Sequence, residues 1–211
     1  MRKKTKINNR AGLEQVVDFL FEAGMLAKTP RSGFHFLGSG DQSIAEHISR
    51  VMYVGFSLCQ ISGKPVDVGK VLQMCVFHDF AEARTSDLNY VHQKYVYADE
   101  EKAVKDLVKN VPFGKAIWQI LDEYRARNSY ESLLAKDADQ LEWILSLKEE
   151  WDIGNNRAKT WIPSAVKRLK TPEAKSLAKL AIKTSSDNWW FANKNDAWWV
   201  SRDSKTKKKR F

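Results

Sequence analysis

Four side chains in this sequence have the chemistry to hold a metal ion. His47, His78, Asp79 and Asp139 each offer a nitrogen or oxygen donor, and mixed sets of imidazole and carboxylate suit borderline divalent cations. His78 and Asp79 follow an apolar segment, where a charged carboxylate is costly to bury unless it is paired or bound to metal. The residue types therefore indicate a metal site built from side chains on facing helices.

Capping signals define the elements that would position these residues. Ser43-Ile-Ala-Glu46 has the form of a capping box, so a helix is expected to begin there and to carry His47 in its first turn. Asp67 can cap a third, apolar helix that runs to about Ala83. That helix would place Glu82 on the same side as His78 and Asp79, because residues three and four apart are neighbours on a helix.

The rest of the chain also shows helical periodicity. Apolar residues recur at three- and four-residue steps over residues 13–27, which predicts a first helix. Residues 28–42 and 84–98 are expected to be irregular. Later helices are predicted over about 99–110, 113–127, 130–151 and 164–183, the last with Thr171-Pro172 as an interruption or fresh start. Strand alternation is lacking, so we expect an all-α bundle of about six to eight helices with no substantial sheet.

Two aspartates compete for the position on the long helix over 130–151. A helical wheel places Asp137 closest to Leu133, Leu141 and Ile144, which favours Asp137 as the inward carboxylate. The motif described below favours Asp139. We adopt Asp139, because a central helix can face its metal site and its apolar core in different directions.

Composition and charge narrow the class of protein. The 211 residues are 43% hydrophobic and 29% charged, as in folded globular proteins, and no apolar run approaches the roughly 20 residues that span a bilayer. No signal-peptide segment follows the basic start, and Cys59 and Cys75 lie among apolar neighbours, as buried reduced thiols do. We therefore expect a cytoplasmic protein without membrane contact.

The chain is expected to fold as one domain between two basic ends. Its net charge of +9 lies largely in these ends, which are commonly solvated. We assign residues 1–12 to a basic segment, 13–184 to the folded domain, and 185–211 to a Trp-rich extension with a basic tail.

Five strings in order resemble a known family. They are Pro30-Arg-Ser-Gly-Phe34, Ser43-Ile-Ala-Glu-His47, His78-Asp-Phe-Ala-Glu-Ala83, Ser86-Asp-Leu88 and Lys136-Asp-Ala-Asp-Gln-Leu141. Together they resemble the HD-domain metal-dependent phosphohydrolases, and within them the 5′-deoxynucleotidase branch, over roughly residues 13–182. The pattern departs in the arginine loop, which ends Ser32-Gly-Phe34 where Trp or a similar ring is expected, and over Phe34–Gln42, which is expected to shape the substrate pocket.

The resemblance implies a role for each matching residue. His47, His78, Asp79 and Asp139 would bind a divalent ion such as Mn, Co, Mg, Fe, Ni or Zn, which lowers the pKa of bound water. Glu82 would act as the orienting or general-base carboxylate and Asp87 near the leaving oxygen or the sugar, while Arg31 would bind phosphate through its planar fork. The implied activity is hydrolysis of a (deoxy)nucleoside 5′-monophosphate to nucleoside and phosphate, by an enzyme that forms a homodimer.

Three alternatives remain open from the sequence. The chain could act on a nucleoside triphosphate or a cyclic nucleotide, because the core defines the bond type better than the substrate. It could be a basic nucleic-acid-binding protein with structural histidines, for which the Trp-rich basic tail is the candidate element; nucleic acid is not the expected partner. A metal-binding scaffold without turnover is disfavoured, because it would need neither Glu82 nor Asp87.

Overall fold

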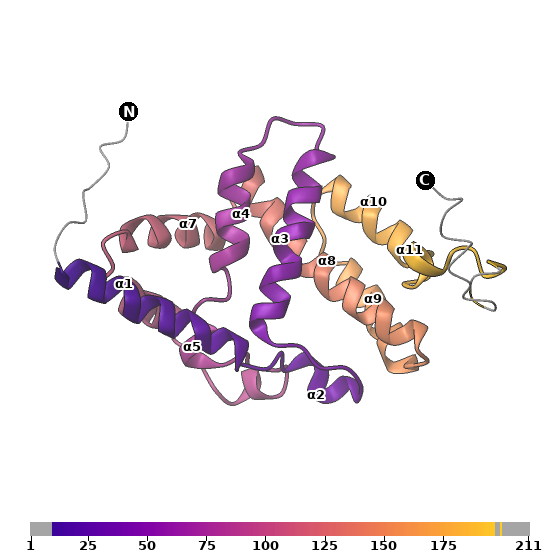
Figure 1. Ribbon diagram of the computed structural model, residues 1–211, viewed down its shortest axis with the longest axis horizontal. Helices are drawn as coiled ribbons and strands as arrows, with labels where there is room; N and C mark the ends of the chain where they lie inside the picture. The colour runs from indigo at the N-terminus through magenta and orange to yellow at the C-terminus, as the bar shows by residue number, and fades with distance from the viewer. Residues whose placement is uncertain (1–9, 197–198, 200–211) are drawn as a thin grey trace.

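The computed structural model describes residues 10–196 and 199, and within them the chain is helical without a sheet, as expected (Figure 1). The helices exceed the expected six to eight because several are a single turn. Their bounds are α1 Arg10–Ala23, η1 Gly24–Ala27, α2 Gly33–Leu37, α3 Ile44–Gln60, α4 Val68–Phe77, α5 Glu82–Thr85, η2 His92–Lys94, α6 Glu100–Val108, α7 Gly114–Ala126, α8 Tyr130–Asp152, α9 Asn156–Val166, α10 Pro172–Ala181 and α11 Asn188–Phe191.

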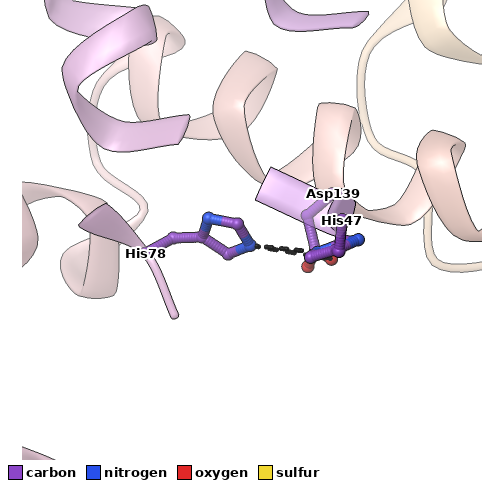
Figure 2. Close-up of side chains that lie close together, drawn as sticks. All are labelled: His47, His78 and Asp139. Carbon is purple, nitrogen blue, oxygen red and sulfur yellow. Dashed lines mark hydrogen bonds and ion pairs between the residues drawn. The ribbon is translucent and has the colours of Figure 1, made fainter. Parts of the chain in front are cut away.

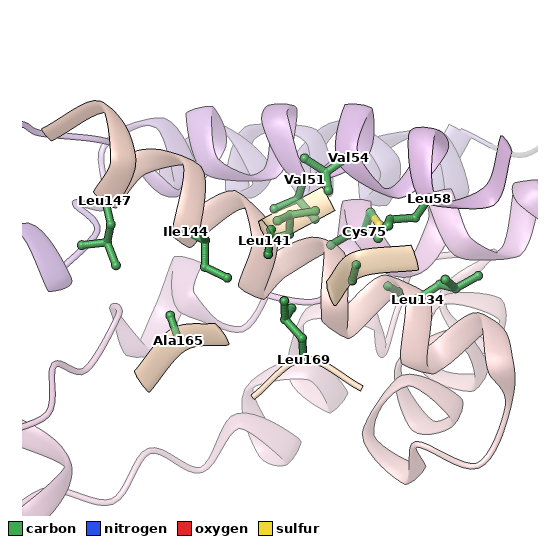
Figure 3. Packing of buried hydrophobic residues seen from close by; sticks show 14 of the residues in the cluster. Val51, Val54, Leu58, Cys75, Leu134, Leu141, Ile144, Leu147, Ala165 and Leu169 are labelled. Carbon is green, nitrogen blue, oxygen red and sulfur yellow. The ribbon is translucent and has the colours of Figure 1, made fainter. Parts of the chain in front are cut away.

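The long helix α8 organises the fold by packing against α3, α4, α7, α9 and α10. Figure 3 shows Leu141 of α8 in the same apolar cluster as Val51 and Leu58 of α3, which are fully buried. A second apolar cluster, around Phe19, Phe80 and Leu121, joins α1 to α7. Helix α3 contributes its first turn to the second cluster and its later turns to the first, so His47 lies where the two clusters meet.

The prediction that one helix runs from Asp67 to Ala83 is wrong. Helix α4 ends at Phe77 with His78 as its C-cap, and α5 begins at Glu82. Between them the amides of Phe80 and Glu82 donate to carbonyls only three residues back, at 3.0 Å each, which tightens the chain out of the α-helical repeat. Asp79 therefore lies in a turn, and Glu82 does not share a continuous helix face with His78.

The region predicted as a helix over 164–183 contains the end of α9, which begins earlier at Asn156, and then α10, whose fresh start at Thr171-Pro172 is confirmed. Helix α9 ends at Val166, and α10 begins at Pro172 with Thr171 as its N-cap. The carboxylate of Asp137 accepts hydrogen bonds from the amides of Lys170 and Thr171 and from the Thr171 hydroxyl. Asp137 thus fixes the turn that separates the helices, and the sequence alone gave no sign of this partner.

The ends of the described chain are exposed and aromatic. Helix α1 leaves Leu13, Leu20 and Phe21 exposed at 55%, 61% and 76%, so its apolar stripe is only partly covered. In α11 the Trp190 and Phe191 rings stack at 5.3 Å. The expected basic residues 1–9, Trp198 and the basic run over 205–210 lie outside the described residues. No helix within the described part is long and apolar enough to cross a membrane.

Candidate metal centre

His47 is placed by the cap that the sequence predicts. The Ser43 hydroxyl accepts from the Glu46 amide at 3.2 Å, and the Glu46 carboxylate accepts from the Ser43 amide at 2.7 Å. This reciprocal pair fixes the start of α3 and puts the His47 ring inside the molecule with no solvent exposure. The first turn of α3, which would otherwise fray, thereby holds His47 in a fixed position.

Three side chains from separate parts of the chain meet at one point, as Figure 2 shows. One donor atom each from His47, His78 and Asp139 lies within 4.8 Å of the others. The two Nε2 atoms of the histidines are 3.3 Å apart, and His47 Nε2 is 3.3 Å from Asp139 Oδ1. The geometry gathers two nitrogens and a carboxylate oxygen around a common volume.

The second nitrogen of each ring explains why both Nε2 atoms suit a cation. His47 Nδ1 is 2.6 Å from Glu142 Oε2, and His78 Nδ1 is 2.9 Å from the Cys75 carbonyl oxygen. These oxygens can only accept, so each Nδ1 carries a proton, and in a neutral ring the lone pair lies on Nε2. A divalent ion can take both Nε2 lone pairs, in place of the proton that His47 Nε2 otherwise holds toward Asp139.

The charge balance points the same way. Burial opposes a charged His47, but hydrogen bonds to Asp139 and Glu142 outweigh that cost and raise its pKa to about 9. Burial also works against the Glu142 carboxylate, yet its contact with His47 lowers the Glu142 pKa to about 2. The site favours positive charge at its centre, so the donor set fits a divalent cation.

Asp79 lies beside the cluster and links it to the arginine loop. Its Oδ2 is 3.5 Å from His47 Nε2 and 3.2 Å from His78 Nε2, and 3.4 Å from Arg31 Nη1. Burial disfavours its charge, but His78 outweighs this by charge and hydrogen bond and holds the Asp79 pKa at about 2. Arg31 thus stands next to the cation volume, with its side chain 15% exposed.

The long helix brings Asp139, and not Asp137, into the cluster. Asp139 Oδ2 accepts from Lys136 Nζ at 2.6 Å and from Gln140 Nε2 at 3.0 Å, which leaves Oδ1 toward the histidines. Asp137 is fully buried on another side, where it binds the turn before α10. Both aspartates are therefore inward, in two different directions.

Glu82 and Asp87 border the same region from the chain after α4. Burial, together with the negative charges of Asp79 and Asp87, raises the Glu82 pKa to about 10, and Glu82 Oε2 is buried without a hydrogen-bond partner among the described residues. Asp87 Oδ2 accepts from the Ser32 amide at 2.8 Å. Glu82 therefore lies close to Asp79 at the cluster, whereas Asp87 holds the arginine loop at Ser32.

A cavity of about 320 Å³ opens onto the cluster. Its walls include Arg31, His78, Asp79, Glu82 and Asp139, so the arginine, three of the proposed metal ligands and one further carboxylate face one volume. Tyr124 also lines it, 5% exposed, and its hydroxyl has no partner among the described residues.

Sequence reasoning missed Tyr124 and Glu142. Glu142 follows Asp139 by three residues on the buried face of α8, which is a signal that spacing could have supplied. The Tyr124 hydroxyl carries no such signal.

Comparisons with known proteins place this site in a family. The HD domain family model matches residues 23–181. The 5′-deoxynucleotidase HDDC2 of Bos taurus is 24% identical over 170 residues, covering 77% of this chain and 82% of the relative. A conserved hypothetical protein from Pyrococcus furiosus superposes with a TM-score of 0.69 at 25% identity, covering 80% of this chain and 99% of that one.

A further solved structure supports the fold alone. The cyanophage S-2L HD phosphohydrolase DatZ, bound to dA and one catalytic Zn²⁺ ion, has a TM-score of 0.50 at 20% identity and covers 77% of this chain and 93% of that one.

The helical bundle and its buried histidine-aspartate cluster define a metal-dependent phosphohydrolase. Because the family model covers most of its length, the chain belongs to the HD domain family.

Proposed function

We propose that this enzyme hydrolyses a (deoxy)nucleoside 5′-monophosphate to nucleoside and phosphate. The observation that carries the proposal is the position of Arg31, which lies 3.4 Å from Asp79 and lines the cavity that opens onto the cluster. A phosphate bound by that guanidinium fork lies next to the cation volume. The 5′-deoxynucleotidases among the relatives supply the substrate class.

The residues divide the work of the reaction between them. His47, His78, Asp79 and Asp139 would hold the ion, which supplies charge to polarise the phosphoryl group and to lower the pKa of water. In hydrolysis a water oxygen attacks phosphorus, the bond from phosphorus to the sugar oxygen breaks, and that oxygen gains a proton. The positive charge of the ion would lower the pKa of Glu82 from about 10, so that its carboxylate could take the proton from the water. Asp87 would lie near the leaving oxygen or the sugar.

Homodimer formation is part of the same proposal. The exposed apolar side chains of α1, Leu13, Leu20 and Phe21 among them, support it, because large exposed apolar patches commonly mark protein interfaces. We further propose a cytoplasmic location, supported by Cys59 and Cys75, which are buried free thiols of the kind a reducing compartment maintains.

We also propose that residues 13–184 form the domain and 185–211 an extension. The larger apolar cluster includes Ile182 among the residues packed on it, whereas Trp190, Phe191 and Trp199 pack on one another. We propose that residues 1–12 form a basic segment, the last three residues of which already belong to α1.

A phosphate-release screen tests the activity. Purified protein is stripped of metal, reloaded with each candidate divalent ion, and incubated with nucleoside mono-, tri- and cyclic phosphates. We expect metal-dependent release of phosphate from monophosphates, and a fall of about 100-fold or more in Glu82→Gln with metal content unchanged. The products of each reaction are separated by chromatography, because a cyclic nucleotide opens to a monophosphate without releasing phosphate. Turnover only of triphosphates or cyclic nucleotides would reject the monophosphate assignment.

A further inference from the structure

A second, larger cavity adjoins the cavity of the metal cluster. It holds about 700 Å³, within the range of roughly 300–1,000 Å³ usual for small-molecule sites. Arg31 and Gln140 line both cavities. A phosphate bound at Arg31 can therefore direct the organic part of its ester into the larger space.

Aromatic rings from two helices form one wall of this larger cavity. Trp143 on α8 and Trp161 on α9 both line it. Trp143 lies four residues after Asp139, so the same face of α8 that carries the proposed ligand carries this indole one turn further on. The wall is thus positioned by the helix that also builds the metal cluster.

The Trp143 ring is held in place from behind. A β-carbon added at Gly33 would lie 3.0 Å from Trp143 Cη2, closer than carbon atoms pack, so glycine allows the indole to sit against the start of α2. Phe34 meets the same indole edge-on, with ring centroids 5.3 Å apart. A ring fixed in this way loses little conformational entropy when it binds a planar ligand.

Polar groups stand between the arginine and the aromatic wall. The Ser32 hydroxyl is buried, with the residue 3% exposed, and it has no hydrogen-bond partner among the described residues. Gln140 donates to Asp139 and accepts from Arg168 at 3.4 Å. The cavity lining therefore includes charged, polar and aromatic groups, the kinds of group that bind a phosphate, a sugar and a base.

We propose that Trp143 is the stacking platform for the heterocyclic base of the substrate, an indole supplied by α8 and not by the arginine loop. This rests on the proposed function, since it assumes that the phosphate binds at Arg31. The Ser32 hydroxyl is left to hydrogen-bond to the sugar. Trp143 is accordingly a specificity-determining residue that selects phosphate esters carrying a base.

Paired substrates test this inference. Wild type and Trp143→Leu are compared on the four deoxynucleoside 5′-monophosphates and on 2-deoxyribose 5-phosphate, which has the same ester without a base. Loss of one base-aromatic stack lowers kcat/KM for the nucleotides by roughly 5- to 150-fold, while the sugar phosphate is unaffected. Trp143→Phe, which keeps a ring, retains most of the nucleotide activity.

The controls separate recognition from folding and from the activity itself. Trp151→Leu changes another indole of α8 that lines neither cavity and is expected to leave both substrates unaffected. If Trp143→Leu lowers nucleotide and sugar phosphate equally, or changes neither, the platform is rejected while the hydrolase assignment stands. Binding of 2′-deoxyadenosine, measured by calorimetry, must also weaken in Trp143→Leu. If wild type hydrolyses none of the esters yet this loss of binding occurs, the proposed function fails and the platform remains.

Discussion

Glu142→Gln would replace the carboxylate that accepts a hydrogen bond from His47 with a neutral amide. Glu142 Oε2 accepts from His47 Nδ1 at 2.6 Å, and both side chains are fully buried. Glutamine keeps the shape and one acceptor oxygen but removes the negative charge. The ring would then be held by a neutral hydrogen bond, and its Nε2 would become a weaker donor to a cation.

The size of the effect follows from the two kinds of hydrogen bond. A bond to a charged group contributes about 1.5–3 kcal/mol and a neutral one about 0.5–1.5 kcal/mol. The difference of about 1–1.5 kcal/mol corresponds to roughly five- to tenfold in the Kd for metal. Glu142→Ala, which removes the acceptor entirely, is expected to cost about 100-fold, the upper end for groups behind a metal ligand.

The assay is a competition titration of metal against a chelator, with Tm recorded for each variant. The control is a substitution at Glu149, the second partner of Arg50. Arg50 donates to Glu142 at 3.0 Å and to the half-exposed Glu149 at 2.7 Å. Glu149→Gln breaks the outer pair without touching His47 and should leave the Kd within about twofold. An unchanged Kd in Glu142→Gln would refute the claim that this carboxylate prepares His47 for metal.

Four further substitutions probe other parts of the site. Glu82→Gln should retain metal, measured by elemental analysis, and lose about 10²-fold or more in turnover; normal turnover would remove Glu82 from the reaction. Asp137→Asn should weaken the hydrogen bonds that Asp137 accepts from three donors at the turn before α10, which lowers Tm at a cost of about 1–3 kcal/mol and leaves metal affinity unchanged. Asp139→Asn should lower metal affinity and leave Tm unchanged. Tyr124→Phe removes a hydroxyl without a partner, so stability should hold while kcat/KM falls by about tenfold if that group donates to the bound phosphate.

Local signals predicted much of the fold. The capping box at Ser43 and the caps at Asp67 and Thr171 mark real helix starts, because each depends on residues within one turn. The break after Phe77 was missed, since Asp79 leaves the helix for contacts with Arg31 and the histidines, residues that are distant in sequence.

The candidate site shows the same division between local and long-range information. Periodicity placed Asp137 inward, and it is buried, but its partners on the turn before α10 lie 33 and 34 residues away. The link from His47 to Glu142 spans 95 residues. Such pairs arise only when α3 and α8 pack, so spacing within one helix can indicate that Glu142 is buried but cannot identify His47 as its partner.

The most direct measurement is X-ray absorption at the metal edge of the purified, metal-loaded protein, together with its metal content. A site formed by His47 and His78 with aspartate oxygens should give a stoichiometric divalent ion with scattering from two imidazole rings, and His47→Ala should remove one of the two. An ion bound through oxygen alone, or a protein that keeps no divalent ion, would contradict the metal centre on which the proposed hydrolysis depends.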